Sequence, residues 1–168
     1  VATHWRMVQA TVYQMIGTNP VCDNSADLKG QRILLTGGYG GIGLETAKGL
    51  VKRGANVTIV GRTEAKLMAA IDRIKEELHL KNSALQGSIR YTVADMSDLD
   101  AVRVLVKRLV IAGQKFDQLI LNAGVWPQEY SRSRQGCEIA FATNALGPHM
   151  LLRSLINSNL LRPEARVI

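Results

Sequence analysis

Five glycines lie between an aliphatic run and a helical pattern in the segment ILLTGGYGGIGLETA, residues 33–47. A glycine-rich turn from a buried strand into a helix brings backbone N–H groups and the positive end of the helix against a phosphate. Glycine suits such a turn because a side chain would hold a pyrophosphate away and because some positions need a positive φ. The segment therefore predicts a binding site for a phosphate-containing ligand.

These glycines fit two spacings. One is the dinucleotide pattern G-x-G-x-x-G, at Gly38, Gly40 and Gly43. The other is T-G-x-x-x-G-x-G, which consists of Thr36, Gly37, Gly41 and Gly43. With a strand before and a helix after, either spacing indicates a dinucleotide site. A P-loop nucleotide hydrolase is excluded because the loop contains no Lys followed by Ser or Thr.

A basic residue stands where a dinucleotide site commonly places an acid. That acid follows the glycine loop by about 20 residues and binds the adenosine ribose. Here the segment VGRT supplies Arg62, and the next carboxylate is Glu64. A guanidinium suits a 2′-phosphate and so favours NADP(H) over NAD(H). The alternative is a solvated Arg at a helix start, where a cation is unfavourable unless a ligand compensates it.

The segments around the glycine loop alternate between strand and helix patterns. Strands are predicted at 32–37, 56–62, 89–95 and 116–124, and a fifth opens at 165–168. Helices are predicted at 42–54, 63–79, 97–113 and 137–156. Strict alternation implies right-handed crossovers and a doubly wound, mainly parallel α/β sheet. We therefore predict a Rossmann-type domain at 30–168, truncated after the start of its fifth strand, preceded by a helix and linker at 1–29.

Two of these helices carry further patterns. The helix at 63–79 has one apolar face, which is expected to pack on the sheet and consists of Leu67, Ile71, Ile74 and Leu78. The helix at 97–113 is expected to start at Ser97, with Asp100 three residues later in a near capping box.

Composition limits the remaining possibilities. The chain has 168 residues and 46% apolar content, which suits one globular domain. Its 21 Lys and Arg against 14 Asp and Glu give a net charge of +7, which favours an anionic ligand. The basic residues are spread along the chain, so no nucleic-acid partner is predicted. Cys22 and Cys137 are interpreted as free thiols, and the three histidines lack metal-ligand spacing. We expect an intracellular, soluble protein without a metal, in the cytoplasm or an organelle.

Four motifs in order resemble those of the short-chain dehydrogenase/reductase family. Its retinol-dehydrogenase-like branch, and beside it the light-independent reductase branch, are the most similar, because VGRTEAKL and ADMSDLDAV follow their spacing. The four motifs are the glycine loop in its second spacing, Asp95 in VADMSD, LNAG at 121–124 and NALGPHMLL at 144–152. The family's N-N-A-G is matched with Leu in place of the first Asn. The resemblance covers about residues 28–168, the family's cofactor-binding part. It implies hydride transfer between NADP(H) and a small carbonyl or alcohol substrate.

The resemblance also implies roles for individual residues. Carried over by position, the cofactor-binding residues are Thr36, Gly37, Gly41, Ile42, Gly43, Arg62, Asp95, Met96, Asn122, Ala123 and Gly124. The glycines of the loop would turn at the pyrophosphate, and Arg62 would bind the 2′-phosphate. Asp95 and Met96 would border the adenine, while the segment 122–124 would line its ribose side and brace the central sheet. The plain alternatives are a helix cap at Asp95 and an ordinary tight turn at 122–124.

Asn144 would be the family's catalytic Asn, whose main-chain carbonyl holds a water that is linked to the active-site Lys. Pro148 follows four positions later and has no N–H to donate to that carbonyl. The sequence would therefore free the acceptor that a water relay needs, with Gly147 easing the kink. A mere packing bend, or a helix that ends there, stays open as an alternative.

The family's catalytic Ser and Tyr-x-x-x-Lys lie beyond the fifth strand, and no Tyr of this chain has a Lys four residues later. An aliphatic strand edge at 166–168 would leave backbone groups unpaired, so we expect further chain or a protein partner to cover it. The leading hypothesis is an NADP(H)-dependent short-chain oxidoreductase in its full-length form. The alternative is a non-catalytic, nucleotide-binding accessory subunit of a larger assembly. The family contacts substrate through the loop at 125–136, which does not identify the substrate.

Overall fold

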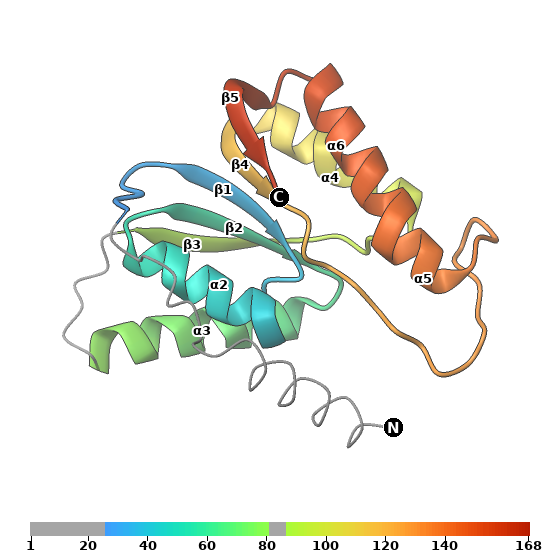
Figure 1. The fold of residues 1–168 in the computed structure, drawn as a ribbon, viewed down its shortest axis with the longest axis horizontal. Helices are drawn as coiled ribbons and strands as arrows, with labels where there is room; N and C mark the ends of the chain where they lie inside the picture. The colour runs from blue at the N-terminus through green and yellow to red at the C-terminus, as the bar shows by residue number, and fades with distance from the viewer. Residues whose placement is uncertain (1–25, 81–86) are drawn as a thin grey trace, which may run out of the picture.

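A computed structural model describes residues 26–80 and 87–168 of the protein. Within them, one sheet of five parallel strands has the order β3-β2-β1-β4-β5 (Figure 1). The strands are β1 (Arg32–Thr36), β2 (Asn56–Gly61), β3 (Ser88–Val93), β4 (Phe116–Ile120) and β5 (Leu161–Val167). The helix predicted near the N-terminus falls on residues 1–25, outside the described residues.

Helices cover both faces of the sheet. They are α2 (Gly41–Lys52), α3 (Glu64–Leu80), α4 (Leu99–Ile111), α5 (Ile139–Phe141), a π-helical turn η1 (Ala142–Leu146) and α6 (Gly147–Asn157). Helices α2 and α3 lie on one face, whereas α4 and the continuous run α5–η1–α6 lie on the other (Figure 1). The predicted doubly wound, Rossmann-type α/β fold is thereby confirmed. None of the helices in the described residues has the length and apolar character that crossing a bilayer requires.

The central strands β1 and β2 are buried on both faces, which explains their aliphatic residues. In β1, Ile33 and Leu35 pack toward α2 and α3, while Leu34 between them packs toward α4 and α6. The apolar face predicted for α3 is also confirmed, since its buried residues include Leu67, Ile71, Ile74 and Leu78. The two core layers therefore fix the helices against the strands whose ends carry the candidate site.

The order of the strands creates a crevice between β1 and β4. The chain moves outward from β1 through β2 to β3, and then returns to place β4 on the other side of β1. Open α/β sheets bind ligands at the carboxyl ends of the strands where the order reverses in this way. The glycine loop follows β1 and the segment LNAG follows β4, so both lie at this crevice.

Helix α4 begins later than predicted. Its N-cap is Asp98, whose carboxylate accepts hydrogen bonds from the N–H groups of Asp100 (2.9 Å) and Ala101 (3.5 Å). The predicted start at Ser97 is wrong because Ser97 donates its N–H and its hydroxyl to Asp95 (2.8 Å each) in the turn before the helix. Gln135 also donates to Asp98 (2.9 Å), so the cap reaches into the loop that follows β4.

The outer strands also differ from their predicted limits. Strand β5 starts at Leu161, which lies opposite Phe116, and regular pairing resumes with Arg166 opposite Gln118. The residues between form a bulge, where Pro163 is tolerated although it has no N–H to donate. Strand β4 ends at Ile120, so LNAG lies beyond the strand instead of inside it.

Replacing Asp98 with Ala is expected to destabilise the fold by about 0.5–2 kcal/mol, the range for the loss of a helix N-cap. The hydrogen bond from Gln135, and then those from the α4 backbone and Arg134, lower the pKa of Asp98 below its ordinary 3.8. Because the folded pKa is lowered, the ionised carboxylate stabilises the fold at neutral pH. This contribution is lost as the pH falls through the pKa of the folded state.

Denaturant unfolding at pH 7 and again near pH 3 measures this effect, and the difference between wild type and Asp98→Ala should shrink at the lower pH. Asp72→Ala, which removes an exposed acid from α3, is the matched control. Equal unfolding midpoints for the wild type and Asp98→Ala at pH 7 would contradict the role of the cap.

Candidate functional site

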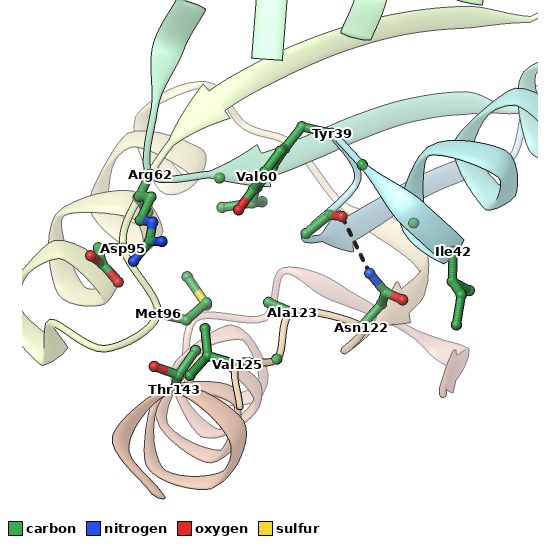
Figure 2. A pocket seen from close by; sticks show the side chains of 16 residues that line it. Tyr39, Ile42, Val60, Arg62, Asp95, Met96, Asn122, Ala123, Val125 and Thr143 are labelled. Atoms are coloured by element: carbon green, nitrogen blue, oxygen red, sulfur yellow. Dashed lines mark hydrogen bonds between the residues drawn. The ribbon is translucent and has the colours of Figure 1, made fainter. Parts of the chain in front are cut away.

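A cleft opens at the carboxyl ends of β1, β2, β3 and β4 (Figure 2). Its lining consists of Gly37, Tyr39, Gly40, Ile42, Gly43, Val60, Gly61, Arg62, Ala94, Asp95, Met96, Asn122, Ala123, Gly124, Val125 and Thr143. All of the predicted cofactor-binding residues line this cleft except Thr36 and Gly41. The structure thus brings together residues from four separate strand ends.

The backbone of the glycine loop agrees with the second of the two spacings. Gly37 and Gly41 have φ of 72° and 53°, a region that favours glycine. A Cβ on Gly43 would overlap the carbonyl oxygen of Gly37 and lie 2.6 Å from Nδ2 of Asn122. Gly40 has an extended backbone and nothing within 4 Å of its Cβ position, so no steric reason requires glycine there. The glycines of T-G-x-x-x-G-x-G are thus all constrained by the loop geometry. In the other spacing Gly38 is constrained as well, since its Cβ would lie 2.5 Å from Cγ2 of Ile59, but Gly40 is not.

Hydrogen bonds tie the end of β1 to the segment after β4. The side-chain amide of Asn122 donates to the carbonyl of Thr36 (3.0 Å), and the Ala123 N–H donates to the Thr36 hydroxyl oxygen (3.0 Å). Thr36 is fully buried, so it reaches the cleft only through these contacts. The hydrogen bond from Asn122 to the end of β1 is the kind of contact expected if Asn122 braces the central sheet.

The N-terminus of α2 faces the cleft without a side-chain cap. Its N-cap is Gly40, no side chain bonds its first N–H groups, and its first turn contains no acid. By contrast, Asp98 caps α4 and Glu138 caps α5, each through two backbone N–H groups. A helix N-terminus carries a partial positive charge and leaves its first N–H groups without intrahelical partners. The start of α2 is therefore suited to an anionic group in the cleft.

Arg62 follows β2 directly, and its guanidinium points into the cleft on the side of Asp95 (Figure 2). The nearby acid Glu64 accepts a hydrogen bond from the Tyr91 hydroxyl (2.8 Å), and this bond raises the pKa of Tyr91. Asp95 accepts from Ser97 in the turn before α4. The alternative that Asp95 caps the helix is wrong, because Asp98 is the N-cap of α4. Asp95 instead stabilises the turn before the helix and lines the cleft.

Met96 and Thr143 form the wall of the cleft nearest α6, together with Val125 (Figure 2). Thr143 is buried and donates its hydroxyl hydrogen bond to the Ile139 carbonyl (2.8 Å). A Cβ on Gly147 would overlap the Met96 carbonyl oxygen. The expectation that Gly147 eases a kink is wrong: its dihedral angles are helical, and it is needed for close packing of the helix on the Met96 backbone.

Asn144 lies in the π-helical turn and binds the segment after β4 with its side chain. Val125 donates its N–H to Oδ1 of Asn144 (2.8 Å), and Nδ2 of Asn144 donates to the Val125 carbonyl (2.9 Å). In the same turn, the Gly147 N–H donates to the Ala142 carbonyl, five residues back. The helix then continues through Pro148 to Asn157, so the alternative that it ends at the proline is wrong.

Several lining residues are not among the predicted cofactor-binding residues. They are Tyr39, Gly40, Val60, Gly61, Ala94, Val125 and Thr143. Five of the seven directly adjoin a predicted site residue in the sequence, and that adjacency is the signal that could have found them. In the predicted substrate loop, Trp126 and Tyr130 are exposed, and Arg132 donates to the Tyr130 hydroxyl (3.0 Å).

Within the described residues, no group of His, Cys, Asp and Glu has the arrangement of a metal site.

Comparison with known proteins assigns the family. The family model described as short chain dehydrogenase matches residues 31–168. The chain therefore belongs to the short-chain dehydrogenase/reductase family, an oxidoreductase family, and this confirms the resemblance of its motifs. Membership supports a nicotinamide dinucleotide as the ligand of the cleft.

Curated relatives confirm the retinol-dehydrogenase-like branch. Polyprenol dehydrogenase of Danio rerio is 32% identical over 149 residues, which are 89% of this chain and 44% of the relative. Retinol dehydrogenase 12 of Mus musculus is 35% identical over 140 residues, 83% of this chain and 42% of the relative. The chain thus spans less than half the length of these relatives.

Solved structures of the family share the fold. The Pseudomonas aeruginosa RhlG/NADP active-site complex matches with a TM-score of 0.66 and 29% identity, over 84% of this chain and 54% of that one. A metagenomic short-chain oxidoreductase in complex with NADP matches with a TM-score of 0.63 and 27% identity, over 79% of this chain and 58% of that one.

Replacing Gly43 with Ala is expected to destabilise the fold by about 1–3 kcal/mol, the usual cost of overpacking, and to abolish nucleotide binding. The reason is that the added methyl group would displace the Gly37 carbonyl or the Asn122 side chain. Gly49→Ala in the same helix is the control, since nothing lies within 4 Å of its Cβ position. The control should be neutral or stabilising. A Gly43→Ala protein as stable as the wild type in denaturant unfolding would contradict the close approach.

Proposed function

We propose that the chain is the cofactor-binding part of an NADP(H)-dependent oxidoreductase that reduces a carbonyl or oxidises an alcohol. The observation that carries this proposal is the combination of an uncapped α2 N-terminus behind the glycine loop with Arg62 at the end of β2. The first suits a pyrophosphate and the second a 2′-phosphate. Family membership and relatives solved with NADP support it.

The residues of the cleft fit such a cofactor. Gly37, Gly41 and Gly43 leave the backbone of the loop open to the pyrophosphate, and Ile42, which is 81% exposed, would lie beside the cofactor. Asp95 and Met96 would border the adenine, and the segment 122–124 its ribose. When bound, the cofactor would supply or accept the hydride, while these residues would bind and orient it.

Asn144 is proposed as a catalytic residue through its main-chain carbonyl. Pro148 has no N–H, so the usual i−4 hydrogen bond to that carbonyl is absent. The π-helical turn at 142–146 supports this role, because such turns often occur at functional sites. The side chain of Asn144 is already engaged with Val125, so the carbonyl is the group left to hold a water.

Proton transfer would depend on a Ser and a Tyr-x-x-x-Lys outside these 168 residues, so hydride transfer is proposed for the complete protein. Further chain or a protein partner would pair with the exposed edge at Val167 and Ile168. We retain the expectation of an intracellular protein. The second candidate, an accessory subunit, is favoured if the complete protein binds NADPH but transfers hydride to no carbonyl compound.

Titration of the chain with NADPH and NADH, followed calorimetrically, tests the cofactor assignment. The wild type should prefer NADPH, and Arg62→Ala should reduce this preference about 10- to 100-fold, because one charge-assisted contact is worth about 1.5–3 kcal/mol. Arg153→Ala, which removes an exposed Arg from α6, should leave the preference unchanged. An unchanged preference in folded Arg62→Ala would remove the assignment of Arg62, and failure to bind either cofactor would remove the proposed function.

A further inference from the structure

A cavity of about 390 Å³ lies at the amino ends of the strands, whereas the cofactor cleft lies at their carboxyl ends. Strands β1, β2 and β3 contribute Arg32, Asn56, Thr58 and Arg90 to its lining, and the turn after α4 contributes residues 112–114. Its volume lies within the range of pockets that bind small molecules. The proposed function gives this cavity no role.

The pairing of the strands places these polar side chains next to one another. Arg32 is paired with Asn56 in the neighbouring strand, and paired residues of parallel strands lie about 4.8 Å apart. Thr58, two residues further along β2, is paired with Arg90. Both Arg32, two residues before Leu34, and Thr58, which is paired with Leu34, lie on the sheet face that α4 covers. The backbone register therefore fixes the four side chains on one face.

Hydrogen-bond donors dominate this lining. Thr58 is only 6% exposed, and neither its hydroxyl nor the guanidinium of Arg32 or Arg90 makes a hydrogen bond or ion pair with another described residue. The side-chain oxygen of Asn56 accepts from the Ser88 hydroxyl (2.7 Å), which leaves its amide N–H groups to donate. A polar group in such a buried place costs free energy until a water or a ligand binds it.

The charges around the cavity favour an anion. Its described lining contains two arginines and no acid. The acid that approaches Arg32 is Asp117, which accepts from the Arg32 backbone N–H (2.7 Å) and forms its ion pair with Arg162 (3.1 Å). The C-terminus of α4 contributes a partial charge of only about −0.5, so the two full positive charges outweigh it. Guanidinium groups bind the oxygens of phosphates through pairs of parallel hydrogen bonds.

We propose that this cavity is a binding site for a phosphate group, either inorganic phosphate or the phosphate of a small monoester. Arg32 and Arg90 neutralise its charge, while the Thr58 hydroxyl and the Asn56 amide donate to its oxygens. A phosphate group suits these donors because it offers several strong acceptor oxygens, which can meet donors from three strands at once. The site lies at the opposite end of the sheet from the cofactor cleft, so the inference does not depend on the proposed function.

NMR titration of the isotope-labelled chain with inorganic phosphate and with glycerol 3-phosphate, at constant ionic strength, tests this site. The backbone amides of residues 112–114 should shift and saturate, while the amides of residues 37–43 report separately on the cofactor cleft. Tighter binding of glycerol 3-phosphate would support a monoester as the ligand, and tighter binding of inorganic phosphate would support the free ion. Sodium chloride at the same ionic strength should cause no saturating shift at residues 112–114.

Two variants and a matched control make the test specific. Arg90→Gln should weaken phosphate binding about 10- to 100-fold, because it removes a charge-assisted contact. Thr58→Val, which keeps the branched shape, should weaken binding about two- to tenfold through loss of one hydrogen bond. Arg108→Gln removes an exposed Arg from the same end of α4, outside the lining, and should change the affinity less than about twofold.

Three results would overturn the inference. They are the absence of a saturating shift at residues 112–114, the same shifts with chloride, and equal weakening by Arg90→Gln and Arg108→Gln. Arg90 is exposed, so its replacement should leave the fold intact and its result can be interpreted. Shifts confined to residues 37–43 would also overturn the second site, and they would leave the proposed cofactor function untouched.

Discussion

The close approach of α2 to the end of β1 is the constraint on which the rest of the cleft depends. Gly43 lies so near the Gly37 carbonyl that no Cβ fits, and the Asn122 amide beside it donates to the Thr36 carbonyl. Three segments from different parts of the chain thus meet at one point. This meeting directs the first N–H groups of α2 toward the crevice between β1 and β4, where an open α/β sheet places its ligand.

Most of the fold could be predicted because its signals are local. Strands buried on both faces appear as aliphatic runs, and α3 shows its buried face as a helical repeat. The predicted ends of helices and strands were wrong where a residue far away in the sequence determines the end. Ser97 and Asp98 are both good helix caps, and the choice of Asp98 is reinforced by Gln135, 37 residues later. The early start of β5 was not predicted because of Pro163, which is tolerated in an edge strand whose pairing is irregular at that point.

The candidate site shows the same division between local and distant causes. Spacing located the glycine loop, and the resemblance to the family located the segment after β4. All of the predicted cofactor-binding residues except Thr36 and Gly41 line the cleft. Tyr39 could not be found in this way, because its place depends on the missing side chain of Gly61, 22 positions along the sequence. Gly147 was assigned to a kink, since its contact with the Met96 backbone is visible only in three dimensions.

The side chain of Asn144 meets Val125 as a neighbouring strand would, accepting from its N–H and donating to its carbonyl. The chain beyond β4 is therefore held by a surrogate strand edge that belongs to a helix 19 residues later. The segment around Val125 is positioned by the helix, because β4 has already ended at Ile120. A shift of the π-helical turn would therefore move the backbone of Val125, which lies between the cleft and the loop that follows it. The wall of the cleft and the start of the loop at 125–136 are thus held by the same two hydrogen bonds.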